Sequence, residues 1–196
     1  MARERSMRIV EVPVERLSAG AFAPFGQIIG DHQEPPVLVG PATRTWRLAL
    51  DMDGAPELVV LRFEYRPFEC TTLERHLAAS QCSVALGDVP SIMVVAGPAG
   101  PAEQDGVPRP EAVRAFFVPA GFGILLWRGI WHSLNRFPVR RQGGDFVMLG
   151  DRETQRELER QTVDGTPTPR TQLVDFAERA GTTFRIVDPQ GLLPPL

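Results

Sequence analysis

The sequence has little of what marks several large classes of protein. Its 196 residues include two cysteines, Cys70 and Cys82, which are too few for a disulfide framework and form no C-x-x-C pair. No apolar run reaches the 18 residues of a membrane-spanning helix. The charged N-terminus also lacks the apolar segment of a secretory signal. These absences predict a cytoplasmic protein with two free thiols and no membrane contact.

Excess positive charge and histidine are scarce as well. The formal net charge is −3, and the signs are interspersed, so no basic face is expected for the phosphates of a nucleic acid. Only three histidines are present, and His32 lies in the polar turn "GDHQEPP", where it is expected to be solvated. Chemistry based on histidine must therefore come from His76 and His132.

Proline and glycine are abundant, and they predict a mainly β fold. The chain has 19 Pro and 18 Gly spread over its length, which favours short strands joined by turns. "TRTWRLALDM" (residues 43–52) alternates apolar and polar residues as a half-buried strand does, and Asp53-Gly54 is a candidate hairpin turn before "ELVVLRF". The further expected strands are "RIVEVPVERL", "TTLERHL", "SQCSVAL", "SIMVVAG", "RAFFVP", "GILLWRG" and "GDFVMLG". Short strands at this spacing indicate a sandwich or a barrel.

The composition changes after Asp151. Residues 151–162, "DRETQRELERQT", are charged and favour a helix. A second helix is expected over residues 168–181, with Thr168 as N-cap, Pro169 at the first helical position and Gly181 as the stop. We therefore expect a barrel domain over residues 8–151 and a helical C-terminal extension over residues 152–196. This extension would pack on the barrel or on a second subunit.

Two segments place polar residues where the surroundings indicate buried strands. In "LERHLAASQ", Glu74 and His76 are two residues apart, so both side chains project from the same face of a strand. Gln81 follows after enough residues for a turn into the neighbouring strand. In "WRGIWHSLN", His132 lies on a later strand, which an antiparallel barrel could bring opposite His76. Glu74, His76, Gln81 and His132 would then face one interior.

This spacing resembles the motifs of the cupin superfamily, in which H-x-H-x(3,4)-E-x(6)-G is followed by P-x-G-x-x-H-x(3)-N. Here Glu74 replaces the first histidine and Gln81 the glutamate, while Gly129 and His132 keep their places. The resemblance implies a cupin-like antiparallel β-barrel of the jelly-roll type with short helices.

A closer resemblance covers roughly residues 8–151. "IVEVPVERLSAGAFAPFGQII", "LERHLAASQ" and "VRAFFVPAGFGILLWRGIWH" resemble the ureidoglycolate lyase family, cupin-fold enzymes with E-R-H-P-x-x-x-Q, L-R-A-F and G-V-x-x-x-R-x-x-W-H-H-P motifs. The matching positions are Glu74, Arg75, His76, Gln81, Arg114, Ala115, Phe116, Gly123, Arg128, Trp131 and His132. The chain departs from the family at Leu77, where proline is usual, and at Ser133 and Leu134, where a second histidine and a proline are usual.

The resemblance implies a carbon–nitrogen lyase that splits ureidoglycolate into glyoxylate and urea, or a relative acting on a small hydroxy or keto acid. It also implies a homodimer and allows a divalent metal ion as the one cofactor. Two alternatives remain. Ser133 in place of a second histidine favours a non-catalytic, regulatory cupin that binds a small acid. A metal-dependent oxygenase is disfavoured because only two histidines are available.

The lyase reaction assigns roles to these residues. His76 and His132 titrate near neutrality and are the candidate base and acid. Glu74 would orient a histidine, and Glu74, His76, Gln81 and His132 could together hold the metal. Arg128 is expected to bind the substrate carboxylate because a guanidinium fork matches its two oxygens. Arg75, Gln81 and Trp131 are further expected substrate contacts, with Trp131 as an apolar wall.

Each role has a structural alternative. His76 and His132 could be hydrogen-bonded histidines of a barrel interior. Glu74 could form an ion pair with Arg75, and Arg128 could pair with Asp145 or Asp151.

Overall fold

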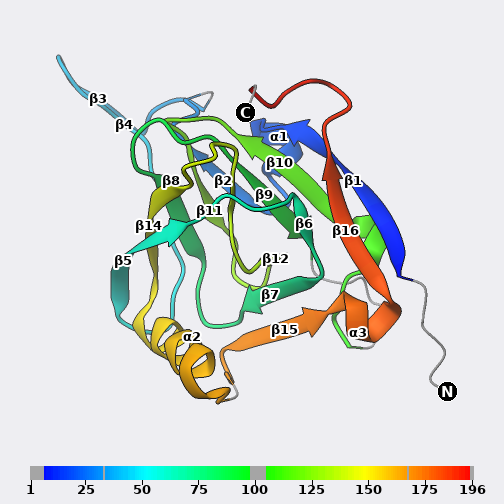
Figure 1. Cartoon of the computed structure of the whole chain (residues 1–196). Coiled ribbons are helices and arrows are strands. Elements are labelled where there is room, and N and C mark those ends of the chain that lie inside the picture. The colour runs from blue at the N-terminus through cyan, green and yellow to red at the C-terminus, as the bar shows by residue number, and fades with distance from the viewer. Residues whose placement is uncertain (1–6, 33, 98–104, 167, 195–196) are drawn as a thin grey trace, which may run out of the picture.

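Two facing β-sheets make up most of the protein, a computed structural model that describes residues 7–32, 34–97, 105–166 and 168–194. The larger sheet has nine strands in the order β15-β7-β12-β9-β10-β1-β16-β6, with β13 paired to β9. The second sheet has the order β2-β11-β8-β14-β5. The sheets curl toward each other (Figure 1). This arrangement confirms the mainly β, barrel-type fold.

The strands of the nine-stranded sheet are β1 (Arg8–Arg16), β6 (Glu69–Cys70), β7 (Thr72–His76), β9 (Ser91–Ala96), β10 (Arg114–Val118), β12 (Trp131–Ser133), β13 (Phe137–Pro138), β15 (Thr171–Asp175) and β16 (Thr182–Val187). Those of the five-stranded sheet are β2 (Gly26–Ile29), β5 (Pro56–Phe63), β8 (Gln81–Ala85), β11 (Gly123–Leu126) and β14 (Gly144–Asp151). A small ribbon pairs β3 (Leu38–Val39) with β4 (Arg44–Thr45).

The helices are short. They are α1 (Ala19–Phe22), the 3-10 turn η1 (Pro110–Ala112), α2 (Arg152–Asp164) and α3 (Phe176–Ala180). Among the described helices, none is long and apolar enough to cross a membrane.

The strand pairs are antiparallel except at β1, which runs parallel to both of its neighbours, β10 and β16. Apolar side chains pack on both faces of the larger sheet. One cluster, with Phe22, Phe25 and Phe116, fills the space between the sheets. The other, with Trp131 and Phe184, lies on the opposite face. The alternation of side chains along each strand sends neighbouring residues into different clusters.

The helix expected over residues 168–181 is wrong for most of its length. Residues 171–175 form strand β15, which pairs with β7 along its full length, and α3 begins only at Phe176. Asp175 caps α3, with its carboxylate accepting from the backbone N–H of Ala177 at 2.7 Å. Gly181 ends the helix with φ of 59°, as expected. The free edge of β7 and the β-branched residues of the segment outweigh its helical propensity.

The C-terminal residues are therefore built into the sheet. β15 runs beside β7, and β16 runs beside β1 (Figure 1). The first expected helix is present as α2 (Arg152–Asp164). Asp151 caps α2 and also accepts a hydrogen bond from Arg170 at 2.9 Å, so the helix is tied to the chain that leads into β15.

The strand expected over residues 43–52 is also wrong beyond Thr45. The segment forms only β4 and an isolated bridge from Met52 to Ala79. Side chains satisfy two of its backbone N–H groups: Gln27 accepts from Ala49, and Ser80 accepts from Asp51. The hairpin expected at Asp53-Gly54 is absent, because the partner of β5 is β14, far along the chain.

Candidate active site

The register of two short strands brings the expected polar residues together. β12 pairs antiparallel with β7, and His132 stands directly opposite Glu74. His76 projects from the same face of β7, two residues further on. Gly129 has a φ of 78° and donates its N–H to the carbonyl of His76 at 2.9 Å. This left-handed turn, which favours glycine, brings β12 beside β7.

Glu74 lies between the two histidines. Its Oε1 is 3.5 Å from Nε2 of His132 and 4.0 Å from Nε2 of His76. Burial by itself would raise the pKa of Glu74, but His132 and His76 beside it lower that pKa overall. Glu74 is therefore an ionised carboxylate in an interior site. It forms no ion pair with Arg75, whose side chain leaves the opposite face of the strand.

His76 has partners for both ring nitrogens. Nδ1 lies 3.0 Å from the hydroxyl of Thr171 on β15, and Nε2 lies 3.1 Å from the amide nitrogen of Gln81. Since an amide nitrogen donates, Nε2 accepts and the ring proton resides on Nδ1. Burial and the neighbouring His132 lower the pKa of His76 to about 4, against the opposing effect of Glu74. At neutral pH this imidazole is uncharged.

His132 is held differently. Its Nδ1 lies 3.1 Å from the carbonyl of Ile130, and because a carbonyl only accepts, Nδ1 carries a proton. Its Nε2 is buried and has no hydrogen-bond partner among the described residues. That nitrogen faces Glu74 and offers either a lone pair or a second proton. Of the two histidines, His132 is thus the one free to exchange a proton.

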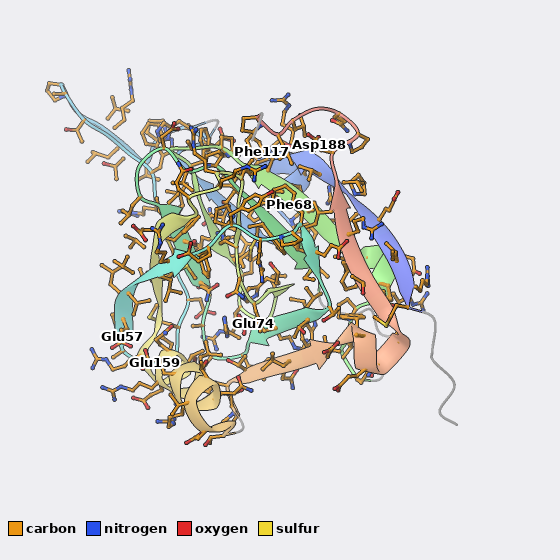
Figure 2. All side chains as sticks on the ribbon, viewed as in Figure 1. Glu57, Phe68, Glu74, Phe117, Glu159 and Asp188 are labelled. Carbon is orange, nitrogen blue, oxygen red and sulfur yellow. The ribbon has the colours of Figure 1, made fainter. Side chains whose placement is uncertain are left out.

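A cavity of about 460 Å³ opens onto this group. Glu74, Gln81 and His132 contribute its polar side, and Leu61, Phe63 and Met148 contribute apolar wall. Helix α2 borders it with residues that include Leu158 and Glu159. Figure 2 shows Glu74 on β7 and Glu159 on α2. The cavity therefore lies where the two sheets and the C-terminal helix meet.

The structure does not bring Arg128, Arg75 and Trp131 to this cavity, against expectation. Arg128 forms ion pairs with Asp51 at 3.0 Å and Asp53 at 2.8 Å, which are not the partners considered from sequence. Arg75 stacks over the ring of Trp131, 4.7 Å from its centroid. Trp131 belongs to the apolar cluster on the opposite face of the sheet. It is next to His132 in sequence, so strand alternation turns it away.

Two residues of the site have no counterpart among the expected ones. Thr171, which holds His76, was assigned to a helix, and only the pairing of β15 with β7 places it here. Arg136 lines the cavity and is 4% exposed. The available signal was its position four residues after His132, in a stretch that is otherwise largely apolar.

The site fits a divalent metal ion. One ligand atom from each of Glu74, His76 and His132 lies within 4.8 Å of the others. The outer nitrogens of both histidines are anchored, at Thr171 and at the carbonyl of Ile130, as is usual for metal-binding histidines. Nε2 of His132, one atom of this set, is buried without a hydrogen-bond partner among the described residues. Gln81 donates to His76, so ligation by His76 would require that amide to move.

A β-barrel interior with a carboxylate, two histidines and an adjoining cavity defines a small-molecule site capable of acid–base chemistry. The family model described as "Ureidoglycolate lyase" matches residues 9–168. The chain belongs to the ureidoglycolate lyase family.

Two curated relatives and one solved structure illustrate how similar this chain is to known proteins. The ureidoglycolate lyase of Burkholderia mallei (strain NCTC 10229) is 34% identical over 160 residues, which cover 74% of this chain and 90% of that protein. That of Azotobacter vinelandii is 38% identical over 134 residues, 64% of this chain and 76% of that protein. A mutant of Bacillus subtilis oxalate decarboxylase matches with a TM-score of 0.34 and 12% identity, over 62% of this chain and 34% of the other.

Proposed function

We propose that the protein cleaves ureidoglycolate into glyoxylate and urea. Family membership supports the reaction, and one observation supports its proposed site. The unpartnered Nε2 of His132, beside the Glu74 carboxylate, faces a cavity of a size suited to a small acid. An enzyme is favoured over the non-catalytic alternative, since the relatives are lyases.

The reaction asks little covalent chemistry of the protein. The central carbon of ureidoglycolate bears a hydroxyl, a carboxylate and a urea nitrogen. When a base takes the hydroxyl proton, the carbonyl of glyoxylate forms and the bond to the urea nitrogen breaks. A proton must then reach that nitrogen. The chain contains no lysine, so no imine with the carbonyl can form on a lysine, and the reaction needs none.

The two histidines divide the work. Nε2 of His132 accepts the hydroxyl proton, and the imidazolium returns it to the departing nitrogen of urea. Oε1 of Glu74 lies 3.5 Å from this Nε2. Its negative charge stabilises the imidazolium until the proton is passed on. His76 stays neutral, because burial lowers its pKa to about 4. The amide of Gln81 holds it beside Glu74.

The same side chains could instead hold a metal ion. Glu74, His76 and His132 would be its ligands, and Thr171 and the carbonyl of Ile130 would keep the two rings oriented. A bound divalent ion would lower the pKa of the substrate hydroxyl and so make its proton easier to remove.

The direct test is the release of glyoxylate from ureidoglycolate by the purified protein, measured with a chelator and with added divalent ions. Turnover that His132→Gln abolishes supports the proposal. His32→Gln is the matched control, because His32 stacks on Trp46 and lines no part of this cavity. Absence of turnover under all conditions, at high enzyme concentration, would overturn the proposed function.

We also infer a homodimer in the cytoplasm. The outer face of the five-stranded sheet supports the dimer: Leu58 and Val60 are 65% and 62% exposed, and they pair with Leu149 and Val147 on β14. Both cysteines are free, which suits a reducing compartment. Light scattering on the wild type and on Val60→Glu tests the dimer, and a monomeric wild type would exclude it.

A further inference from the structure

The most unusual charge in the cavity belongs to Arg136. It lies in the connection between β12 and β13 and is 4% exposed, yet it lines the cavity beside His132. Its Nη1 is buried without a hydrogen-bond partner among the described residues. Its guanidinium lies over an aromatic ring, with Cζ 6.0 Å from the centroid of Phe146, and it also interacts electrostatically with the Cys82 thiol. Buried charges normally have a partner, because their desolvation is costly.

No carboxylate of the described chain neutralises Arg136. The cavity holds two acidic side chains, and both have other contacts. Glu74 faces His132 and His76, while Glu159 accepts from Gln155 on the same helix. Burial lowers the pKa of Arg136 to about 9, so the guanidinium remains protonated at neutral pH. The cavity thus contains a cation whose counter-ion must come from outside the described chain.

We propose that Arg136 binds the carboxylate of the substrate and thereby determines the specificity of the site for small acids. The inference rests on the proposed function for the identity of that acid. A guanidinium presents parallel N–H donors that match both oxygens of a carboxylate. Arg136 takes the role that the sequence assigned to Arg128, whose guanidinium is already occupied by Asp51 and Asp53.

The position of Arg136 also gives the substrate a direction. With the carboxylate held at Arg136, the hydroxyl on the adjacent carbon is presented toward Nε2 of His132, which borders the same cavity. The apolar walls from Leu61, Phe63 and Met148 strengthen the charge pairing because they exclude water. A substrate that lacks the carboxylate would leave Arg136 buried and unpaired.

N-(hydroxymethyl)urea is the substrate that tests this role. It keeps the hydroxyl and the urea of ureidoglycolate but has no carboxylate, and its cleavage gives formaldehyde and urea. The wild type is expected to prefer ureidoglycolate strongly. Arg136→Gln should lower kcat/KM for ureidoglycolate by about 10- to 100-fold, the range for losing charge-assisted hydrogen bonds. It should leave kcat/KM for N-(hydroxymethyl)urea unchanged or higher.

Arg66→Gln is the matched control. Arg66 also stacks on a phenylalanine, 4.1 Å from the centroid of Phe137. Its Nε is buried without a hydrogen-bond partner among the described residues, but Arg66 does not line the cavity. It should lower both rates equally or not at all. An equal loss on both substrates in Arg136→Gln would make Arg136 a structural residue and overturn the proposal.

Binding of glyoxylate separates this inference from the lyase reaction. Calorimetric titration should show about 10- to 100-fold weaker binding to Arg136→Gln, with partial recovery in Arg136→Lys, because lysine keeps the charge without the fork. If the wild type binds glyoxylate through Arg136 but does not turn over ureidoglycolate, the proposed function fails and the carboxylate site stands. Equal binding of glyoxylate by wild type and Arg136→Gln would overturn the carboxylate-binding role of Arg136 and leave the proposed lyase reaction standing.

Discussion

The two halves of the space between the sheets are built on opposite principles. In the apolar half, Phe22 and Phe116 meet edge to face with ring centroids 5.3 Å apart, and Phe25 and Ile124 complete a close-packed cluster. The polar half contains Glu74, His76, Gln81, His132 and Arg136 around a cavity. The boundary passes through β12, since His132 stands between Glu74 on β7 and Val95 of the apolar cluster on β9.

The difference separates stability from chemistry. Apolar packing lowers the free energy of the folded state and holds the strands in register. In the polar half, Nε2 of His132 and Nη1 of Arg136 are buried without hydrogen-bond partners among the described residues, which costs stability. Such atoms are tolerated when a ligand satisfies them. Substitutions in the two halves should therefore have opposite signatures.

The largest expected effect on activity is in the polar half. His132→Gln removes the proton acceptor and should lower kcat by about 10²- to 10⁴-fold, the usual contribution of general acid–base catalysis. Its melting temperature should stay close to that of the wild type, because Nε2 of His132 has no hydrogen-bond partner in the part of the chain that the structure describes. Glyoxylate release and calorimetry measure the two quantities. A variant that loses stability but keeps kcat would show His132 to be structural.

The largest expected effect on stability is in the apolar half. Phe116→Ala should lower the free energy of unfolding by about 3 to 5 kcal/mol. Phe116 is fully buried, and its ring packs against Phe22 and Phe25. Denaturant unfolding measures this change, with Phe116→Leu as the graded control. The fraction that remains folded should retain the wild-type kcat. A selective loss of kcat would mean that the halves are coupled.

A smaller effect is expected where α2 is attached. Burial alone would raise the pKa of Asp151, but hydrogen bonds from Thr154 and Arg170 lower it overall. A lowered pKa stabilises the fold above the pKa of the unfolded state, and this contribution is lost as pH falls through the folded-state value. Asp151→Asn should therefore cost about 1 to 3 kcal/mol at pH 7, and the difference from wild type should shrink toward pH 3.

Denaturant unfolding at both pH values checks this sign. Glu153→Gln is the matched control, because Glu153 lies on the same helix in an exposed pair with Arg156. It should change stability less at both values. A wild-type advantage over Asp151→Asn that grows as pH falls would contradict the lowered pKa of Asp151.

The smallest effect is expected outside the two halves. Arg128→Gln and Arg75→Gln should leave kcat/KM for ureidoglycolate within about twofold of wild type, as is usual for substitutions away from the reacting groups. Arg128 pairs with Asp51 and Asp53, and Arg75 stacks on Trp131, all away from the cavity. If Arg128→Gln lowered kcat/KM as much as Arg136→Gln does, Arg128 would be the residue that binds the substrate carboxylate.

The polar pair on β7 could be predicted because its signal is local. Residues two apart share a face of a strand, so Glu74 and His76 followed from spacing alone, whereas the turn at Gly129 that sets β12 beside β7 is seen only in the structure. Trp131 was misassigned for a related reason. Adjacency in sequence suggested that it shares the site of His132, but adjacent strand residues point to opposite faces.

Which arginine lines the cavity could not be predicted from the sequence. Every arginine carries the same charge, and the carboxylates that could pair with it lie far away in the chain. Asp53 pairs with Arg128 from 75 residues earlier in the chain, whereas Arg136 has no acidic partner among the described residues. The C-terminal segment failed for a similar reason. The helix-like pattern of residues 168–181 gave way to an open edge on β7, about 100 residues earlier in the chain.

The sequence by itself determined the class of fold through its pattern of short strands and turns, and the family through its resemblance to the family's motifs. It also placed Glu74 and His76 on one face, because strand alternation acts over a few residues. Only the tertiary structure decided that Nε2 of His132 has no hydrogen-bond partner among the described residues, that Thr171 secures His76 and that Arg136 lines the cavity. Each of these depends on which strand, helix or carboxylate from a distant part of the sequence lies beside the side chain in the folded protein.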